Sequence, residues 1–293
     1  MAADYLQIGI DLVNVRKYEK AIAFLTDFIK VNPTHSEAYN YRGTAYYCQH
    51  NDQQAIADFE KAIACTKGYQ NAYTNLAILY RDAFEYQKAL EYFIAAHELD
   101  EKNQEILQDI VYVYILLKDY HPAIPFCEKL IQLSPKSNDV LCCNSDIYMF
   151  IGNYQKAIKY CKQLLANGYN SAIILNNLGF AYLELGDFPS AETYLNLALK
   201  IDPNFAYALD NLGFIQYKYK NYAKALAYIH QSISIDMSNS YAFKNLALVY
   251  LALGQKEDAY ESLIFARELG YQKSYGEAVN ILLETHFLNK IEG

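Results

Sequence analysis

Asparagine recurs at a fixed interval in the C-terminal half of this chain: Asn177, Asn211 and Asn245 are each 34 residues apart. A carboxamide offers both a hydrogen-bond donor and an acceptor. A regular row of such groups can therefore hold the main chain of an extended peptide, whatever side chains that peptide carries. The alternative is that each amide hydrogen-bonds a neighbouring part of the same chain and only sets how these parts stack.

Residues that support catalysis do not gather in a recognisable pattern. The six histidines are scattered, and no glycine-rich phosphate loop, nucleophile elbow or HExxH pair is present. The six cysteines show no zinc-site spacing, so we expect reduced thiols, with Cys127 and Cys161 buried in helices. We therefore predict that the chain is not an enzyme and that it holds no cofactor and no metal.

A period of 34 residues extends over most of the chain. Blocks that begin at residues 2, 36, 70, 104, 138, 172, 206 and 240 align without an insertion or a deletion. A strict period of this length indicates a stack of small units, each burying its apolar face on its neighbours. Position 8 is small in most blocks: Gly9, Gly43, Ala77, Val111, Ser145, Gly179, Gly213 and Ala247. Position 20 is always alanine: Ala21, Ala55, Ala89, Ala123, Ala157, Ala191, Ala225 and Ala259.

Each block has the pattern of two antiparallel helices. Apolar residues recur every three or four positions, which is the helical spacing. Turn residues such as Gly186-Asp187 interrupt the middle of a block, and pairs such as Asp202-Pro203 end it. The small residue at position 8 and the alanine at position 20 predict a close approach of the two helices, with bulky residues around the contact.

The period, the small and alanine columns, the aromatic columns and the terminal proline resemble the tetratricopeptide repeat. The tryptophan usual in that family is replaced by Tyr5, Tyr39 and Tyr73 and then by leucine or phenylalanine, which keep a large apolar group there. The resemblance implies an all-α fold, a right-handed α-solenoid (superhelix) of eight helix-turn-helix units with a C-terminal capping helix. The solenoid is expected over residues 2–273 and the cap over 274–293. The repeats are expected at 2–35, 36–69, 70–103, 104–137, 138–171, 172–205, 206–239 and 240–273.

The resemblance also implies that the first helices of the units line a concave wall. Positions 2, 5, 6, 9 and 12 of each block are then expected to face a groove. The asparagines at position 6 are similar to the asparagine ladder in the repeat domain of O-linked N-acetylglucosamine transferases. Aromatic residues beside adaptable polar groups are typical of recognition surfaces. The residues predicted to bind a partner are Asn75, Asn176, Asn177, Asn211, Asn245, Asp210, Lys244, Tyr207, Tyr241, Phe180, Phe214 and Tyr217.

These patterns predict an adaptor or scaffold that binds an extended peptide or a helix of another protein in the groove. The alternative is a structural protein that assembles with itself and leaves the groove empty. The first four units lack the lysine and arginine pattern of repeats that capture the C-terminal carboxylate of heat-shock chaperones, so we do not expect that ligand. A net charge of -8 argues against nucleic acid. With no signal peptide and no long apolar run, we expect a cytoplasmic chain without membrane insertion.

The middle and the ends of the chain depart from the repeat pattern. Val111 and Ser145 replace the small residue of position 8, and Pro125 is expected one turn inside a helix, where it would bend that helix. This region is then either a bend between two binding surfaces or neutral drift. At the N-terminus, Leu6, Ile10 and Val13 are expected to be uncovered. On the last helix, apolar residues spread over more than half of the circumference: Ile281, Leu282, Leu283, Phe287, Leu288 and Ile291. Either the outer face of this helix is partly exposed, or it meets another chain in a homo-oligomer.

Overall fold

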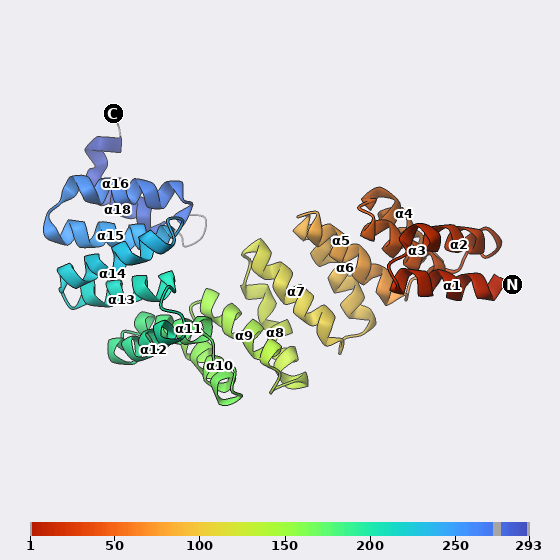
Figure 1. Cartoon of the computed structure of the whole chain (residues 1–293), viewed down its shortest axis with the longest axis horizontal. Helices are drawn as coiled ribbons and strands as arrows, with labels where there is room; N and C mark the ends of the chain where they lie inside the picture. The colour runs from red at the N-terminus through yellow and green to blue at the C-terminus, as the bar shows by residue number, and fades with distance from the viewer. Residues whose placement is uncertain (1, 272–276, 292–293) are drawn as a thin grey trace. The chain divides into compact units, whose positions relative to one another are not determined.

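The computed structural model describes residues 2–271 and 277–291, and in this part of the chain helices are joined by short turns with no strand (Figure 1). The chain divides into two compact units, Met1–Cys143 and Asn144–Gly293, and the division falls within helix α9 (Asn138–Phe150). The prediction of an all-α repeat fold is confirmed.

The N-terminal unit is built from helix pairs, one pair to each block. Its elements are α1 (Ala2–Asn14), α2 (Tyr18–Val31), α3 (Ser36–Cys48), α4 (Asp52–Cys65), α5 (Gln70–Asp82), α6 (Tyr86–Leu99), α7 (Gln104–Leu117), the 3₁₀ turn η1 (His121–Ala123) and α8 (Ile124–Leu133).

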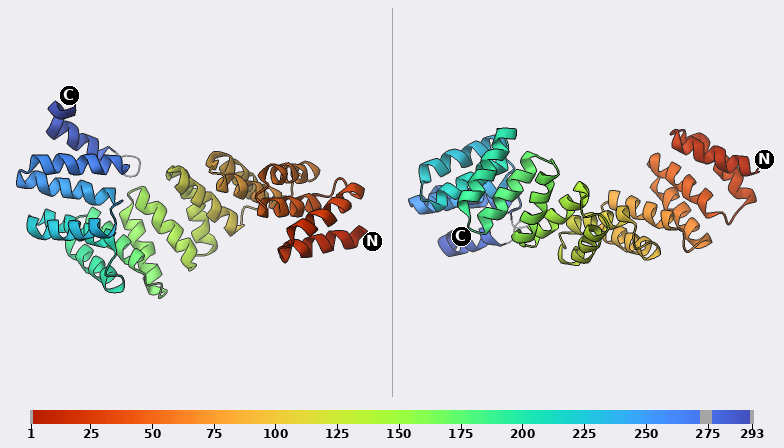
Figure 2. Two further views of the ribbon diagram at one scale, coloured as in Figure 1. Left: turned by 45° about the horizontal axis from the view of Figure 1, so that its top comes forward. Right: turned by 90° about the horizontal axis from the view of Figure 1, so that it is seen from below.

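The C-terminal unit repeats this arrangement. Its elements after α9 are α10 (Tyr154–Ala166), α11 (Ala172–Glu184), α12 (Phe188–Ile201), α13 (Ala206–Lys218), α14 (Tyr222–Ile235), α15 (Ser240–Leu253), α16 (Lys256–Glu268) and α18 (Ala278–Ile291). The first helix of a repeat packs on its own second helix, and several first helices also contact the first helix of the next repeat, as α13 contacts α14 and α15 (Figure 2).

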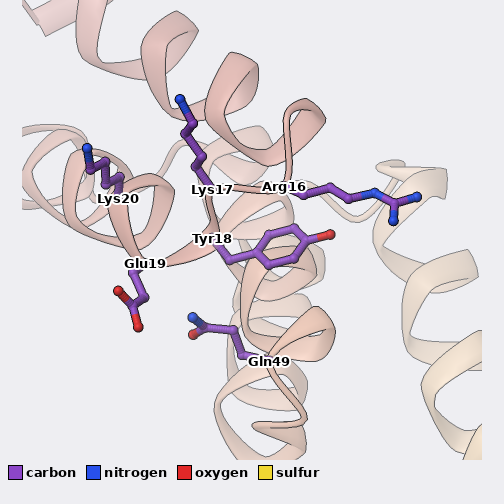
Figure 3. Close-up of a pocket in the computed structure, with 6 residues that line it drawn as sticks. All are labelled: Arg16, Lys17, Tyr18, Glu19, Lys20 and Gln49. Atoms are coloured by element: carbon purple, nitrogen blue, oxygen red, sulfur yellow. The ribbon is translucent and has the colours of Figure 1, made fainter.

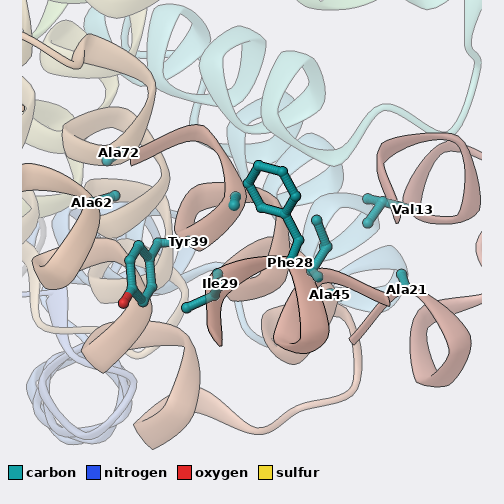
Figure 4. Close-up of a cluster of buried hydrophobic side chains, with 10 residues drawn as sticks. Val13, Ala21, Phe28, Ile29, Tyr39, Ala45, Ala62 and Ala72 are labelled. Carbon is teal, nitrogen blue, oxygen red and sulfur yellow. The ribbon is translucent and has the colours of Figure 1, made fainter. Parts of the chain in front are cut away.

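The close approach of the two helices of a repeat is present where the small residues predict it. A Cβ atom placed on Gly179 would lie 2.5 Å from Cγ of Leu195, and one on Gly43 would lie 2.8 Å from Cε1 of Phe59. Real Cβ contacts are almost never shorter than about 3 Å, because interiors are close-packed. Figure 4 shows part of the resulting core, in which Phe28 and Tyr39 gather with small alanines from neighbouring helices.

The two blocks without a small residue at position 8 carry a small residue on the opposite helix instead. Val111 and Ser145 occupy position 8 of their blocks, and Cys127 and Cys161 occupy position 24. In a later block, Gly179 and Leu195 stand at these two positions. Val111, Ser145 and both cysteines are fully buried, which confirms the expected burial of the cysteines. The volume of one side chain therefore compensates for that of the other, which is how packed cores tolerate substitution.

The turn inside each repeat requires a left-handed backbone at position 15. Glycine meets this requirement in three blocks, for example Gly186 with φ of 79°. The other five blocks place residues with a side chain there at φ of 57–61°, which is unfavourable because the Cβ approaches the following carbonyl. These residues are Arg16, His50, Phe84, Lys118 and Lys220.

The expectation for Pro125 is wrong, because this residue lies at the start of a helix and not one turn inside it. Helix α8 begins only at Ile124, after the 3₁₀ turn η1, so Pro125 occupies its first turn. At that position the missing N–H costs no helical hydrogen bond. The second helix of this repeat is therefore shortened to 10 residues, where the equivalent α12 has 14.

The ends of the chain are more covered than the sequence suggests. Val13 is buried in the N-terminal core, whereas Leu6 and Ile10 are partly exposed. At the other end, α18 packs on α16 and directs Val279, Leu283 and Phe287 into the last core cluster. Ile281 is 58% exposed. The side chains of Leu288 and Ile291 lie outside the described residues.

Candidate partner-binding surface

Asparagine side chains connect the first helices of adjacent repeats. Nδ2 of Asn211 donates to Oδ1 of Asn176 over 3.0 Å, from α13 to α11. One repeat later, Nδ2 of Asn245 on α15 donates to Oδ2 of Asp210 over 2.9 Å. In each pair, the residue at position 6 reaches the residue at position 5 of the preceding repeat.

The same contact is found in the N-terminal unit. Nδ2 of Asn75 on α5 lies 2.9 Å from Oδ1 of Asn40 on α3 and 3.4 Å from the hydroxyl oxygen of Thr44. The contact therefore recurs wherever position 6 is asparagine and position 5 of the preceding repeat carries an amide or carboxyl oxygen.

This arrangement corrects the expected row of free carboxamides. Asn211 is only 5% exposed and Asn245 only 1%, and each directs an N–H group to the neighbouring repeat. Asn177 differs, since it is partly exposed and makes no side-chain hydrogen bond with any described residue. The bonding of asparagine to a neighbouring repeat, which the sequence left open as the alternative, is thus what the structure contains. A part for these residues in partner binding stays a prediction.

We call the hydrogen-bonded side chains of Asn176, Asn211, Asp210 and Asn245 the ladder. Aromatic rings from three consecutive first helices lie next to the ladder. Phe180 of α11 makes edge contacts with Tyr154 of α10 and with Tyr241 of α15, at centroid distances of 6.1 and 6.4 Å. Phe214 of α13 stacks on Tyr217 at 5.8 Å. We call the surface formed by Asn177, Phe180, Phe214, Tyr217 and Tyr241 the aromatic face; all five residues are partly exposed.

A lysine is held among these rings. Lys244 of α15 is only 7% exposed, and its Nζ lies 4.1 Å from the ring centroid of Tyr241, 5.0 Å from that of Phe214 and 6.0 Å from that of Tyr271. An ammonium over an aromatic face is attracted by the ring quadrupole, more strongly where water is excluded. Burial lowers the pKa of Lys244 to about 8, although the charges of Asp210 and Glu184 act in the opposite direction.

Asp210 is the one carboxylate of the ladder. Burial raises its pKa to about 7, opposed by the hydrogen bond from Asn245 and the charge of Lys244. Among the described residues, Oδ1 of Asp210 and Oδ1 of Asn245 are buried and accept no hydrogen bond. Such groups are costly to bury, and they are usually satisfied by a water molecule or a ligand.

The remaining predicted site residues divide between the two units. Asn75 belongs to the N-terminal unit, and the other predicted residues belong to the C-terminal unit. Tyr207 is exposed, with its ring 6.2 Å from that of Phe205.

The sequence did not point to four neighbours of the aromatic face: Tyr154, Glu184, Lys218 and Tyr271. Lys218 and Glu184 end their helices, and Tyr154 and Tyr271 lie outside the first helices of the repeats. Positions facing inward on a first helix could not include them, so only their charge and size gave a signal.

The N-terminal unit has a shallow hollow of about 400 Å³ where the turn before α2 meets α3 (Figure 3). Its lining includes Arg16, Lys17 and Lys20 with Tyr18 and Gln49. Figure 3 shows the three basic side chains extending in different directions. They do not converge on a point where one anion could contact all of them, and we assign no ligand to this hollow.

Neither a metal site nor a membrane span is found in the described part of the chain. No group of three or more His, Cys, Asp or Glu side chains comes together there. No helix in residues 2–271 and 277–291 has the length and apolar character needed to cross a bilayer.

Paired helices that recur at a period of 34 residues, with polar side chains bonded between neighbouring repeats, define the chain as a helical-repeat protein. Models of the tetratricopeptide repeat family match residues 6–69, 70–99, 104–137 and 136–204. The chain belongs to the tetratricopeptide repeat family, as its sequence predicted.

Two curated relatives match shorter segments of the chain. The Hsp70-Hsp90 organizing protein of Triticum aestivum is 27% identical over 107 residues, which is 36% of this chain and 18% of the wheat protein. Tetratricopeptide repeat protein 6 of Homo sapiens is 32% identical over 92 residues, 30% of this chain and 18% of the human protein. The matches thus span about a fifth of each relative.

Solved structures of repeat proteins share the fold at low sequence identity. A tetratricopeptide repeat protein from Parabacteroides merdae aligns with a TM-score of 0.55 at 18% identity, over 85% of this chain and 98% of its own. YrrB, described as having an unusual peptide-binding site, aligns at 0.59 and 18% identity, over 63% of this chain and 95% of its own. The APC/C hetero-tetramer Cut9-Hcn1 aligns with a TM-score of 0.58 at 17% identity, over 94% of this chain and 54% of its own. These likenesses concern the fold alone.

Proposed function

We propose that this chain is a non-enzymatic adaptor or scaffold that binds an extended segment or a helix of a partner protein on its aromatic face. The observation that carries the proposal is the gathering of partly exposed rings from α11, α13 and α15, of which Phe214 and Tyr241 lie against one buried lysine, Lys244. Aromatic anchors supply large contact area at little entropic cost, and they dominate the binding energy of many interfaces.

The ladder fixes the positions of the three helices that carry the aromatic face. The hydrogen bonds from Asn211 to Asn176 and from Asn245 to Asp210 hold three first helices in register. A surface ordered before binding loses less entropy when the partner arrives. Asn177 then has an amide available for the partner's main chain, and we expect micromolar affinity, about -8 kcal/mol. The names of YrrB and of the wheat relative, which concern peptide binding and chaperone organisation, agree with a role in protein interaction.

Affinity capture from the native cell tests the proposal with a matched pair of variants. The face variant carries Asn177→Ala, Phe180→Ala and Phe214→Ala, and the control carries Leu197→Ala and Ile201→Ala, two exposed apolar residues of the second helix α12. We expect the face variant to lose its partner, since removal of an anchor costs about 1–2 kcal/mol and each 1.4 kcal/mol is about tenfold in affinity. Equal capture by both variants, with unchanged circular dichroism, contradicts the proposal.

The second candidate, self-assembly through the C-terminal helix, has one observation in its favour. Ile281 of α18 is 58% exposed, while its neighbours on the helix pack inward. Sedimentation velocity over a hundredfold range of concentration, with wild type and Ile281→Glu, tests this candidate. A mass that stays constant in both proteins rejects it, and dimerisation lost in the variant supports it.

The proposal includes a cytoplasmic location and a partner that is neither nucleic acid nor membrane. It is consistent with the absence of a disulfide among the cysteines of the described residues, because disulfides form mainly in oxidising compartments. Cell fractionation of the tagged chain is the test, and recovery with membranes or nucleic acid contradicts this part of the proposal.

A further inference from the structure

Two lysine ammonium groups approach the same ring of the aromatic face. Nζ of Lys244 lies 5.0 Å from the centroid of Phe214, and Nζ of Lys218 lies 4.9 Å from it. Lys218 also lies 5.8 Å from the ring of Tyr217. The two lysines come from α15 and α13, which are adjacent first helices.

Neither ammonium is neutralised by a direct contact. Within residues 2–271 and 277–291, Lys218 and Lys244 form no ion pair and donate no side-chain hydrogen bond. Their charges repel each other, and this repulsion lowers the pKa of Lys244 further. Like charges held close together are unfavourable unless an opposite charge lies nearby.

Two acidic residues lie near the lysines, but neither pairs with them. Glu184 ends α11, is exposed, and interacts electrostatically with both Lys244 and Lys218. Asp210 is buried, and its Oδ2 atom accepts the hydrogen bond from Asn245. Glu184 is therefore an exposed acid that interacts with Tyr154 and lies near the lysines without a direct ion pair, whereas Asp210 is part of the ladder.

We infer that Lys218 and Lys244 recognise a side-chain carboxylate of the partner segment, an aspartate or glutamate that stands next to an apolar or aromatic residue. This inference rests on the proposed function, and it specifies the chemistry of the segment bound there. The rings hold both lysine stems in place before the partner arrives, so a carboxylate meets ordered donors at the edge of a partly desolvated surface. Charge-assisted hydrogen bonds of this kind are about twice as strong as neutral ones.

The inference fixes the sign of each charge change. Removal of either lysine charge weakens binding of an acidic segment. Removal of the Glu184 charge strengthens it, because Glu184 competes with the incoming carboxylate for the same two ammonium groups. A basic segment would show the opposite signs at all three positions, so the two kinds of partner are distinguished by the same variants.

The test begins with a phage-displayed library of random heptapeptides, selected on the chain of residues 1–293. The best peptide and its analogue with each acidic residue changed to the amide are then titrated by fluorescence anisotropy. The variants are Lys218→Met with Lys244→Met, which keep the apolar stems, and Glu184→Gln at an exposed position. Lys200→Met, an exposed lysine of α12, is the control for the loss of one charge.

We expect selected peptides to be enriched in aspartate or glutamate, and the amide analogue to bind at least about tenfold more weakly. That difference should vanish in the double lysine variant and persist in the control, while Glu184→Gln should bind the acidic peptide more tightly. Enrichment of apolar peptides without acid, or of basic peptides, overturns the inference and leaves the proposed function standing. Failure of every peptide to bind overturns both.

Discussion

Asn245 donates a hydrogen bond from Nδ2 to Oδ2 of Asp210 over 2.9 Å, and this bond joins equivalent helices of two adjacent repeats. In the preceding repeat junction the acceptor is a neutral amide, Oδ1 of Asn176. Asp210 is 1% exposed, so a group that can ionise occupies a position at which an amide makes the same contact. A buried carboxylate is stabilised in its protonated form.

This relationship predicts a pH-dependent effect of Asp210→Asn. The folded pKa of Asp210, about 7, lies above the ordinary value of 3.8, so the native state binds more protons than the unfolded state between about pH 4 and pH 7. The stability of the wild type therefore falls through this interval as pH rises. We expect Asp210→Asn to be more stable than wild type at pH 8, by roughly 1–3 kcal/mol, and near wild type at pH 4. Urea unfolding at both pH values measures the difference.

The reverse change at the equivalent position is the control. Asn176→Asp introduces the carboxylate where the structure has an amide that accepts from Asn211. We expect it to destabilise the protein at pH 8 and to have much less effect at pH 4. A gain from Asp210→Asn that is as large at pH 4 as at pH 8 would contradict the assignment of a buried charge.

The ladder also predicts which asparagines contribute to stability. Asn211→Ala removes a buried hydrogen bond and leaves Oδ1 of Asn176 without it, so we expect a loss of about 1–3 kcal/mol. Asn177→Ala removes a partly exposed amide without a side-chain hydrogen bond, and we expect a change within about 0.5 kcal/mol. Thermal and urea unfolding of the two variants, one position apart, give the comparison. Similar losses in both would mean that the ladder does not carry this energy.

The fold could be predicted in detail from the sequence because the same pattern of small, apolar and turn residues recurs in each repeat. Glycine or alanine at position 8 had one physical explanation, the close approach that Gly179 and Leu195 display. The 34-residue period placed the turns, and the left-handed residue of each turn follows the same register.

The site was less predictable, because the direction of a polar side chain depends on its neighbour. Asn211 and Asn177 share a column in the repeat, yet Asn211 finds an amide one repeat earlier and Asn177 makes no such bond. The sequence placed Lys244 among the groove residues, but its burial among Phe214, Tyr241 and Tyr271 is visible only in the structure. Periodicity gives the position of a residue in a repeat, whereas contacts between repeats depend on residue pairs about 35 positions apart.

The compensation between positions 8 and 24 predicts a rescue. Gly179→Val places its side chain where Leu195 already lies 2.5 Å from the site of a Cβ, and we expect a loss of about 1–3 kcal/mol. Leu195→Cys alone leaves a cavity and costs about 2–4 kcal/mol. The double variant reproduces the pair formed by Val111 and Cys127, and it should be more stable than the sum of the single effects by about 1 kcal/mol or more. Urea unfolding of the four proteins completes the cycle.

A glycine without close neighbours provides the comparison for that cycle. Gly186 has no atom within 4 Å of its Cβ site and has φ of 79°, so Gly186→Val is destabilising through the backbone alone. Leu195→Cys should not rescue it. Additive effects in both cycles would show that the small residue at position 8 is not required by the residue at position 24.

The turn after α5 predicts a stabilising substitution. Phe84 has φ of 61°, and its side chain is 78% exposed. Its left-handed backbone is therefore unfavourable, and the burial of so little apolar surface does not offset this cost. We expect Phe84→Gly to raise stability by about 0.5–1 kcal/mol, and Gly186→Ala at the equivalent turn to lower it by a similar amount. The midpoints of urea unfolding measure both changes in stability, provided that the dependence of the unfolding free energy on urea concentration is the same in all proteins. If Phe84→Gly lowered the midpoint, the contact between the rings of Phe84 and Tyr86, with centroids 6.2 Å apart, would outweigh the backbone cost.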